Sequence, residues 1–351
     1  MTDSTAAPAK RVILTDLRIW DGTQKLAADT LVISAGYLET LCMKSALGPT
    51  DARQAVSLRG ATVLPGLIDA HVHMVLDPDR PTPPSAGETG DPVAMRQRAA
   101  QMVAAGITTA RDLGGGGWSE LELRDLINRG ETPGPRLLCS GQPITSPKGH
   151  CHFWGGEAEN ASAAREVIRR QVEHGVDLIK VMATGGRFTR GSNPMKAQFN
   201  TETLREIVKS ARAKALPVAA HCHGTRGIEA AVRAGVHTIE HCSWVGEGGW
   251  ASDYQRAIVD LMAASGTWVS PTINRGWQRI IDADGATLQR MRHALEDMRQ
   301  AGIPFMASTD AGIPGVYHHQ LPEAFGSVIK PAVYLAALEQ PDAYTLATLL
   351  D

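Results

Sequence analysis

Two histidines separated by a single residue, His71 and His73, follow a short apolar segment that begins at Leu64. Alternate side chains of a β-strand share one face, so a strand at this position points both imidazoles at one place. Imidazole pairs of this kind favour zinc, manganese, iron or nickel over hard cations. A His-X-His motif is also common as two ordinary histidines near a turn, so it predicts a metal site only together with further ligands.

Four more residues with ligand chemistry lie within or after later β-type segments. They are Lys180 in Leu-Ile-Lys-Val-Met, His221 in Ala-Ala-His-Cys-His-Gly, His241 in Ile-Glu-His-Cys and Asp310 in Ser-Thr-Asp-Ala-Gly. Taken singly, a histidine at a strand end often hydrogen-bonds a loop carbonyl, and an aspartate there often caps the next helix. Four such positions in register with the two histidines predict that all six side chains converge.

The elements that must position these residues alternate regularly from residue 61 onward. The predicted strands are 62–70, 108–111, 136–139, 178–182, 218–220, 238–240, 267–270 and 304–307, and the predicted helices include 93–105, 120–129, 161–174, 201–215, 227–234, 254–264 and 286–301. Strict alternation indicates parallel strands, and eight such units predict an α/β fold of the closed (β/α)8, or TIM barrel, type. Barrel enzymes keep their chemistry at the C-terminal mouth, where these six residues are expected.

A doubly wound open sheet is the alternative architecture, but it requires a spaced glycine fingerprint after an early strand. The glycines at 114–117 lack that spacing. Short β-like segments at 12–14, 17–20, 31–33 and 56–58 precede the alternating region. We therefore predict a small N-terminal β-module, an incomplete β-sandwich, over residues 1–60 and the barrel over residues 61–351.

The composition narrows the class of partner. Lys and Arg total 35 against 37 Asp and Glu in 351 residues, and no basic run suggests nucleic acid. No apolar stretch approaches the roughly 18 residues of a membrane span, and the polar start differs from a signal peptide. Five cysteines, an odd number without framework spacing, suit a reducing compartment. We expect a cytoplasmic protein that binds a small-molecule substrate, with neither nucleic acid nor membrane as a partner.

The sequence resembles the amidohydrolase superfamily. The resemblance is to the branch that contains imidazolonepropionase-like hydrolases, Xaa-Pro and Xaa-Arg dipeptidases and ochratoxinase-like amidases. The segments that carry the resemblance occur in the same order: 64–73, 179–186, 219–224, 239–241 and 309–312. The resemblance implies a binuclear metal centre. One ion is expected on His71, His73 and Asp310, the other on His221 and His241, with N6-carboxylated Lys180 bridging them. Zinc is the first expectation for both ions, and manganese, cobalt, iron and nickel are alternatives.

The reaction implied by this resemblance is hydrolysis of an amide bond by a metal-activated hydroxide. Asp310 is expected to take the proton of the water and pass it to the leaving amine. The expected substrate is a dipeptide or an N-acyl-amino acid. The alternatives are hydrolysis of a cyclic amide, an ester or an organophosphate at the same metals, or a truncated pseudoenzyme that acts as a scaffold subunit.

Candidate substrate contacts are weaker. His223 shares a face with His221 if the strand continues, and the resemblance implies a catalytic contact to the carbonyl or oxyanion. His150, or its neighbour His152, is expected to touch substrate. Arg187 and Arg190 follow the Lys180 strand and are expected to bind a substrate carboxylate through paired hydrogen bonds. The remaining histidine pair, at positions 318 and 319, is expected in a solvated loop.

The sequence departs from the family pattern at its end. Relatives continue past the eighth barrel helix into strands that complete the N-terminal sandwich, whereas this sequence stops at Asp351. Without these strands, we expect an exposed strand edge in the N-terminal module. Such an unpaired edge invites pairing with another chain. We also expect a homo-oligomer.

Overall fold

The computed structural model describes residues 11–277, 279 and 285–327. The chain divides into two compact units, Met1–Pro65 and Gly66–Asp351, where the sequence predicted 1–60 and 61–351. Each unit has its own buried side chains. Within the described residues, no helix is long and apolar enough to cross a bilayer.

The N-terminal unit is built on a four-stranded sheet in the order β4-β3-β1-β5. Its strands are β1 (Arg11–Thr15), β3 (Thr30–Ser34), β4 (Tyr37–Cys42) and β5 (Val56–Ser57). β3 and β4 form an antiparallel hairpin whose turn holds Ala35 and Gly36 at positive φ. β2 (Arg18–Ile19) pairs with β6 (Thr62–Val63), and short helices η1 (Lys44–Ala46) and α1 (Pro49–Gln54) complete the unit. The edge strand β4 and helix α1 were not predicted, because their side chains are mostly exposed and lack a regular apolar pattern.

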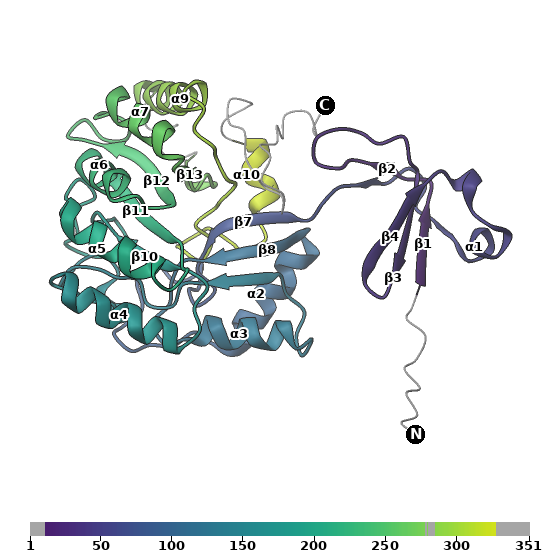
Figure 1. Ribbon diagram of the computed structural model, residues 1–351, viewed down its shortest axis with the longest axis horizontal. Coiled ribbons are helices and arrows are strands. Elements are labelled where there is room, and N and C mark those ends of the chain that lie inside the picture. Colours follow the sequence, from purple (N-terminus) through teal and green to yellow (C-terminus); the bar gives the residue numbers. More distant parts are fainter. Residues whose placement is uncertain (1–10, 278, 280–284, 328–351) are drawn as a thin grey trace. The chain divides into compact units, whose positions relative to one another are not determined.

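The larger unit holds two parallel sheets (Figure 1). One contains β7 (Leu67–Val72), β8 (Ile107–Asp112) and β9 (Arg136–Cys139), and the other contains β10 (Ile179–Met182), β11 (Val218–Gly224), β12 (Thr238–Val245) and β13 (Trp268–Ser270). Every pair within these sheets is parallel. Seven of the eight predicted strands therefore occur, within a few residues of the predicted bounds.

Backbone contacts join the two sheets. Ile144, which follows β9, forms a parallel bridge to Val181 of β10. Phe305 bridges Val269 of β13, and the carbonyl of Ala307 accepts a 2.9 Å hydrogen bond from the N–H of Ala70 in β7. The predicted eighth strand, 304–307, thus lies between β13 and β7 as single bridges rather than as a strand of either sheet. The unit is an α/β fold of the TIM-barrel type, without one continuous eight-stranded sheet in the part of the chain that is described.

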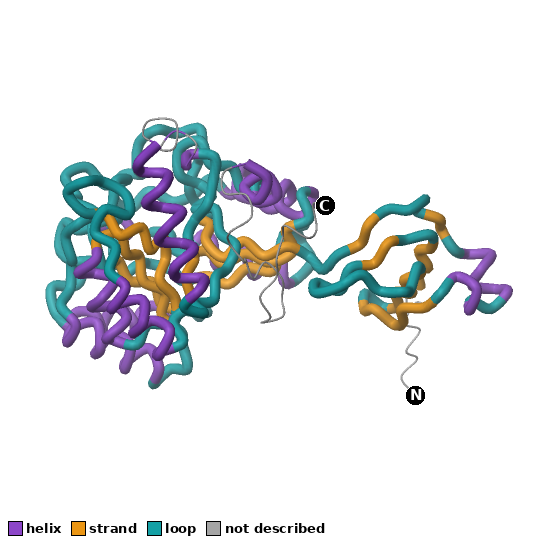
Figure 2. Tube along the Cα trace, turned by 90° about the horizontal axis from the view of Figure 1, so that it is seen from above, coloured by secondary structure: helices purple, strands orange, loops and turns teal. Residues whose placement is uncertain are grey.

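Helices follow the strands and form the outer layer of this unit (Figure 2). They are α2 (Pro92–Ala104), α3 (Ser119–Asn128), α4 (Ala161–Glu173), α5 (Thr201–Arg212), α6 (Thr225–Ala234), α7 (Arg256–Ser265), α9 (Gly285–Gln300) and α10 (Leu321–Ser327). Asp91, Asn160 and Asn200 accept hydrogen bonds from the first-turn N–H groups of α2, α4 and α5, a contact that typically contributes about 1 kcal/mol. These caps fix where each helix begins, and so where the loops before them end.

Candidate metal centre and active site

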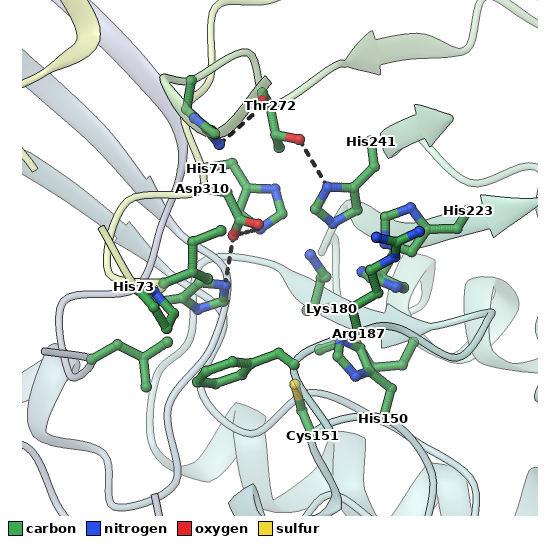
Figure 3. A pocket seen from close by; sticks show the side chains of 18 of the residues that line it. His71, His73, His150, Cys151, Lys180, Arg187, His223, His241, Thr272 and Asp310 are labelled. Carbon is green, nitrogen blue, oxygen red and sulfur yellow. Dashed lines mark hydrogen bonds and ion pairs between the residues drawn. The ribbon is translucent and has the colours of Figure 1, made fainter. Parts of the chain in front are cut away.

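All six predicted ligands line one cavity of about 460 Å³ in the larger unit. His71 lies in β7, Lys180 in β10, His221 in β11 and His241 in β12. His73 follows directly after β7, and Asp310 directly precedes Ala311, which forms a parallel bridge to Val72. Parallel strands therefore deliver the six side chains to one place, as their spacing predicted. Figure 3 labels His71, His73, Lys180, His241 and Asp310 around the cavity.

The two histidines of the His-X-His motif are each held from behind. The Nδ1 atom of His71 lies 3.0 Å from Oε2 of Glu240, and Nδ1 of His73 lies 3.0 Å from the carbonyl oxygen of Gly114. Their Nε2 atoms lie 3.3 Å and 3.4 Å from the same oxygen, Oδ1 of Asp310. One nitrogen of each ring is thus occupied by an oxygen acceptor, and the other faces the carboxylate across the cavity.

In the other two histidines, too, one ring nitrogen contacts an oxygen atom and the other is free among the described residues. Nε2 of His221 lies 3.0 Å from the carbonyl oxygen of Gly185, and Nδ1 of His241 lies 2.9 Å from Oγ1 of Thr272. Metal-binding histidines usually direct their second ring nitrogen to such a partner, which fixes both tautomer and ring orientation. The opposite nitrogens, Nδ1 of His221 and Nε2 of His241, remain for a ligand, and the two ring centroids are 4.5 Å apart.

The donor set fits divalent transition metals. Ligand atoms of His71, His241 and Asp310 all lie within 4.8 Å of one another, and so do those of His221, His223 and His241. Imidazole nitrogens and carboxylate oxygens suit zinc, manganese, cobalt, iron and nickel. The cavity therefore offers two overlapping groups of candidate metal ligands, with His241 common to both.

An unusual backbone conformation brings Glu240 and His241 to the same ring. Successive strand residues normally face opposite sides, yet Glu240 binds His71, and the ring of His241 lies 5.1 Å from that of His71. His241 has φ of 67°, and Asp310 has φ of 63°. The left-handed region is costly for residues other than glycine and is concentrated at functional sites.

Lys180 is 1% exposed and borders the cavity. Burial lowers the pKa of its amine to about 8 because a buried cation loses hydration. Within the described residues the amine forms no ion pair. A lysine with a depressed pKa has a larger neutral fraction, which is the form that reacts with carbon dioxide to give a carbamate.

The protonation states of the other ligands suit metal binding. Burial lowers the pKa of His71 to about 4 and holds the pKa values of His221 and His241 well below the ordinary value, so the imidazoles are neutral at pH 7. Burial alone would raise the pKa of Asp310, but His71 and His73 hold it below its usual range. The carboxylate is therefore ionised.

Comparison with known proteins decides the family. A model of the family described as the amidohydrolase family matches residues 62–343. The chain belongs to the amidohydrolase family. This confirms the resemblance on which the ligand set was assigned.

Individual relatives agree with this membership. Ochratoxinase from Aspergillus niger is 29% identical over 290 residues, which are 73% of this chain and 59% of that protein. The chain thus spans well under two thirds of the length of this relative. A Xaa-Pro dipeptidase with methionine bound in its active site superimposes with a TM-score of 0.77 at 24% identity, over 90% of this chain and 83% of that one. The A. niger ochratoxinase structure gives a TM-score of 0.69 at 25% identity, over 88% and 77%.

Beside the six predicted ligands, amidohydrolase-type chemistry needs groups that bind substrate, and the cavity brings three of the predicted substrate contacts together. His223 stacks on His241 with ring centroids 4.7 Å apart, and Trp250 packs edge-on against His223. The guanidinium carbon of Arg187 lies 4.9 Å from the centre of the Trp250 ring. His150 lines the cavity with Nδ1 held by Oγ1 of Thr189 at 3.0 Å.

Arg190 is not brought to the site. Arg190 is exposed and does not line the cavity. His152 does not line the cavity either. Of the two predicted arginines, only Arg187 borders the cavity.

His318 corrects one expectation. It is buried rather than solvated, and its Nε2 donates a 3.1 Å hydrogen bond to the carbonyl oxygen of His73. The same carbonyl packs against Gly312, where an added Cβ would lie 2.5 Å from the oxygen, and Gly312 has φ of 108°. The backbone after the His-X-His motif is therefore enclosed by the segment that follows Asp310. His319, expected in the same solvated loop, is half-buried.

Several aromatic and polar lining residues escaped the sequence analysis. They are Trp154, Phe188, Trp250, Thr272, Asn274 and Trp277. They lie in the segments between the strands and the long helices, partly in short helical turns, where no periodic pattern marks which side chains point inward. The one available signal was their position shortly after predicted strands of a barrel, the place from which substrate contacts come.

Proposed function

We propose that this chain is a binuclear metal-dependent amidohydrolase that cleaves an amide bond of a small molecule with a free carboxylate, such as a dipeptide or an N-acyl-amino acid. The observation that carries this proposal is the convergence of four histidines, Asp310 and a buried lysine in one cavity. Each of the four histidines has its second ring nitrogen engaged by an oxygen acceptor. Such an arrangement has a clear purpose in a metal site and little value as a means of stabilising a fold.

The proposal assigns the ligands as follows. His71, His73 and Asp310 would hold one ion, His221 and His241 would hold the second, and N6-carboxylated Lys180 would supply oxygen ligands to both. Bound divalent ions supply Lewis acidity toward a carbonyl oxygen and lower the pKa of water towards about 7. Zinc fits the nitrogen and oxygen donors, and manganese, cobalt, iron or nickel are accepted by the same set. Bridges on both sides of residues 304–307 support the closed (β/α)8 barrel that this arrangement requires.

Asp310 moves the proton in this proposal. Its carboxylate is ionised at neutral pH because His71 and His73 hold its pKa below the usual range. It accepts the proton of the attacking water and delivers that proton to the leaving amine. General acid–base catalysis of this kind typically contributes about 10²- to 10⁴-fold in rate.

His223 stabilises the oxyanion in this proposal. Burial lowers the pKa of its ring to about 3, so the imidazole is neutral and carries one proton. Its Nδ1 pairs with the hydroxyl of Ser243. With that hydroxyl donating to Nδ1, the ring proton lies on Nε2, which donates to the oxygen that gains charge.

Arg187 binds the substrate carboxylate in this proposal. Its guanidinium borders the cavity, and Trp250 supports it through a cation–π contact. A guanidinium pairs with a carboxylate through two parallel, charge-assisted hydrogen bonds. The contact positions the amide over the metals, so its loss lowers kcat/KM.

The experiment compares a dipeptide with its C-terminal amide on the zinc-, manganese- or cobalt-loaded enzyme. Amidation is expected to lower kcat/KM at least about 10-fold on the wild type, and Arg187→Ala is expected to erase most of that difference. Arg190→Ala is the matched control, because it changes an exposed arginine of the same loop outside the cavity. Amidation that costs less than about threefold, with no response in Arg187→Ala, contradicts the carboxylate contact. Absence of amide hydrolysis with every metal across a dipeptide and N-acyl-amino-acid panel contradicts the function.

A further inference from the structure

One side of the metal cavity is apolar and separate from the main core. Within the described residues, a distinct hydrophobic cluster contains Leu76, Cys151, Phe153, Trp154 and Met182, with Phe188 and Ile313 packed against it. All of these except Phe153 also line the cavity. We call the lining set the apolar wall: Leu76, Cys151, Trp154, Met182, Phe188 and Ile313.

The apolar wall begins beside a proposed metal ligand and is supported from behind. The ring of Trp154 lies 5.2 Å from that of His73. Phe153, which does not reach the cavity, packs edge-on against Trp154 at 5.2 Å and against Phe188 at 6.1 Å. Trp154 is 2% exposed and Leu76 is 5% exposed, so this surface is fixed by packing before any ligand arrives.

The opposite side of the cavity carries charge and hydrogen-bonding groups. In Figure 3, His73 lies on one side of the Lys180 amine, and His223 and Arg187 lie on the other. Arg187 and Phe188 are neighbours in the loop after β10, yet Arg187 stacks on Trp250 while Phe188 joins the apolar wall. This loop therefore contributes to both sides of the cavity.

We infer that the apolar wall is the subsite for the acyl group of the substrate and selects a bulky apolar group, an aromatic ring or a branched alkyl chain. The inference rests on the proposed function: a carboxylate held by Arg187 belongs to the amine half of the amide, so the acyl half extends toward His73 and the apolar wall. A phenyl ring transfers its own apolar surface from water onto this wall, whereas a small acyl group such as acetyl has little apolar surface to transfer. Full burial of a side chain of that size typically changes affinity by about 10- to 100-fold.

The test uses N-acetyl-alanine and N-phenylacetyl-alanine, which share the amine half and differ only in the acyl group. The wild type is expected to prefer the phenylacetyl substrate at least about 10-fold in kcat/KM, mainly through KM. Phe188→Ala is expected to reduce that preference at least about threefold, because Phe188 is half-buried on a loop and its ring faces the cavity. Arg190→Ala is the matched control: it changes an exposed residue of the same loop outside the cavity and is expected to keep the preference.

A preference ratio is insensitive to the metal-loaded fraction, because both substrates meet the same enzyme. Equal kcat/KM values for the two substrates, or an unchanged ratio in Phe188→Ala, overturn the subsite while leaving the hydrolase proposal intact. Calorimetric titration of the metal-loaded protein with phenylacetate and acetate tests the subsite independently of amide hydrolysis. Tighter binding of phenylacetate, weakened in Phe188→Ala, supports the subsite even when neither amide is cleaved, and that result counts against the proposed reaction alone.

Discussion

His71 and Glu240 are in contact in the interior of the larger unit. Nδ1 of His71 lies 3.0 Å from Oε2 of Glu240, although 169 positions separate the two residues in the sequence. The other oxygen of Glu240 accepts a 2.7 Å hydrogen bond from Nη2 of Arg111. Burial alone would raise the pKa of Glu240, but Arg111 and His71 hold it below the usual range. The neutral His71 ring therefore donates Nδ1–H to a carboxylate, which leaves the Nε2 lone pair for a metal.

Glu240→Gln is expected to weaken metal binding about 10- to 100-fold, because it removes the negative charge that orients the His71 ring and raises the basicity of its free nitrogen. The dissociation constant for zinc, measured by competition with a chromophoric chelator, checks this. Glu229→Gln, on the exposed face of α6 where Glu229 pairs with Arg233, is the control and should leave affinity unchanged. Equal affinity of Glu240→Gln and wild type would show that this contact does not position a ligand.

Lys180→Ala is expected to lose most amide hydrolysis, and small carboxylic acids such as acetate or propionate are expected to restore part of it. A free carboxylate can occupy the space of the carbamate and supply the same anionic oxygens, whereas a protonated lysine there would repel the ions. Activity with and without added acid is the measurement, and Lys209→Ala on the exposed surface of α5 is the control. Wild-type turnover and metal content in Lys180→Ala would exclude the bridge.

Asp310→Asn is expected to lower kcat at least about 100-fold, because an amide does not accept the proton of the water. Steady-state kinetics on protein of verified metal content gives the split between kcat and KM. A change confined to KM would make Asp310 a positioning residue rather than the proton carrier.

Glu120 provides a pH-dependent prediction away from the metals. It is fully buried on α3, neither of its oxygens has a hydrogen-bond partner among the described residues, and burial together with Asp112 raises its pKa to about 8. Between the ordinary value of 4.5 and about 8, the unfolded chain releases this proton while the folded chain keeps it. Folding stability therefore falls as pH rises through that window, by at most about 1.4 kcal/mol per pH unit from this group.

Glu120→Gln removes that loss, so its stability relative to wild type is expected to increase steadily from pH 5 to pH 8. Denaturant unfolding at several pH values measures the difference. Glu122→Gln, an exposed neighbour on the same helix, should show no such trend. A stability difference that is constant over this pH range would mean that Glu120 is ionised in the folded protein.

The sequence predicted the alternation of strands and helices because periodic apolar patterns report burial directly. Strand β9 has the predicted bounds, and most others differ by one or a few residues. The eighth predicted strand, 304–307, forms only single bridges, and short irregular pairings of this kind leave the same apolar pattern as a full strand. Its place beside β7 nevertheless delivers Asp310 to His71 and His73.

What the sequence did not predict depends on loops and on strained backbone. Strand alternation predicts that Glu240 points away from the site, and only the positive φ of His241 lets both neighbours face inward. His318 lies far along the chain in a polar segment, yet it is buried against the carbonyl of His73. The aromatic rings of Trp154, Phe188 and Trp250 come from separate loops, whose conformations no local pattern encodes.

The number of metal ions bound per chain is the most direct test of the proposed binuclear centre. Purified protein reconstituted with zinc and bicarbonate, then freed of excess metal, is measured by elemental analysis together with its thermal midpoint. We expect about two ions per chain. Exhaustive chelation is expected to lower thermal stability and abolish amide hydrolysis, since binding to the folded state alone stabilises it. Folded protein that retains no metal after reconstitution, or whose stability and turnover are unchanged once metal loss is verified, would contradict the account.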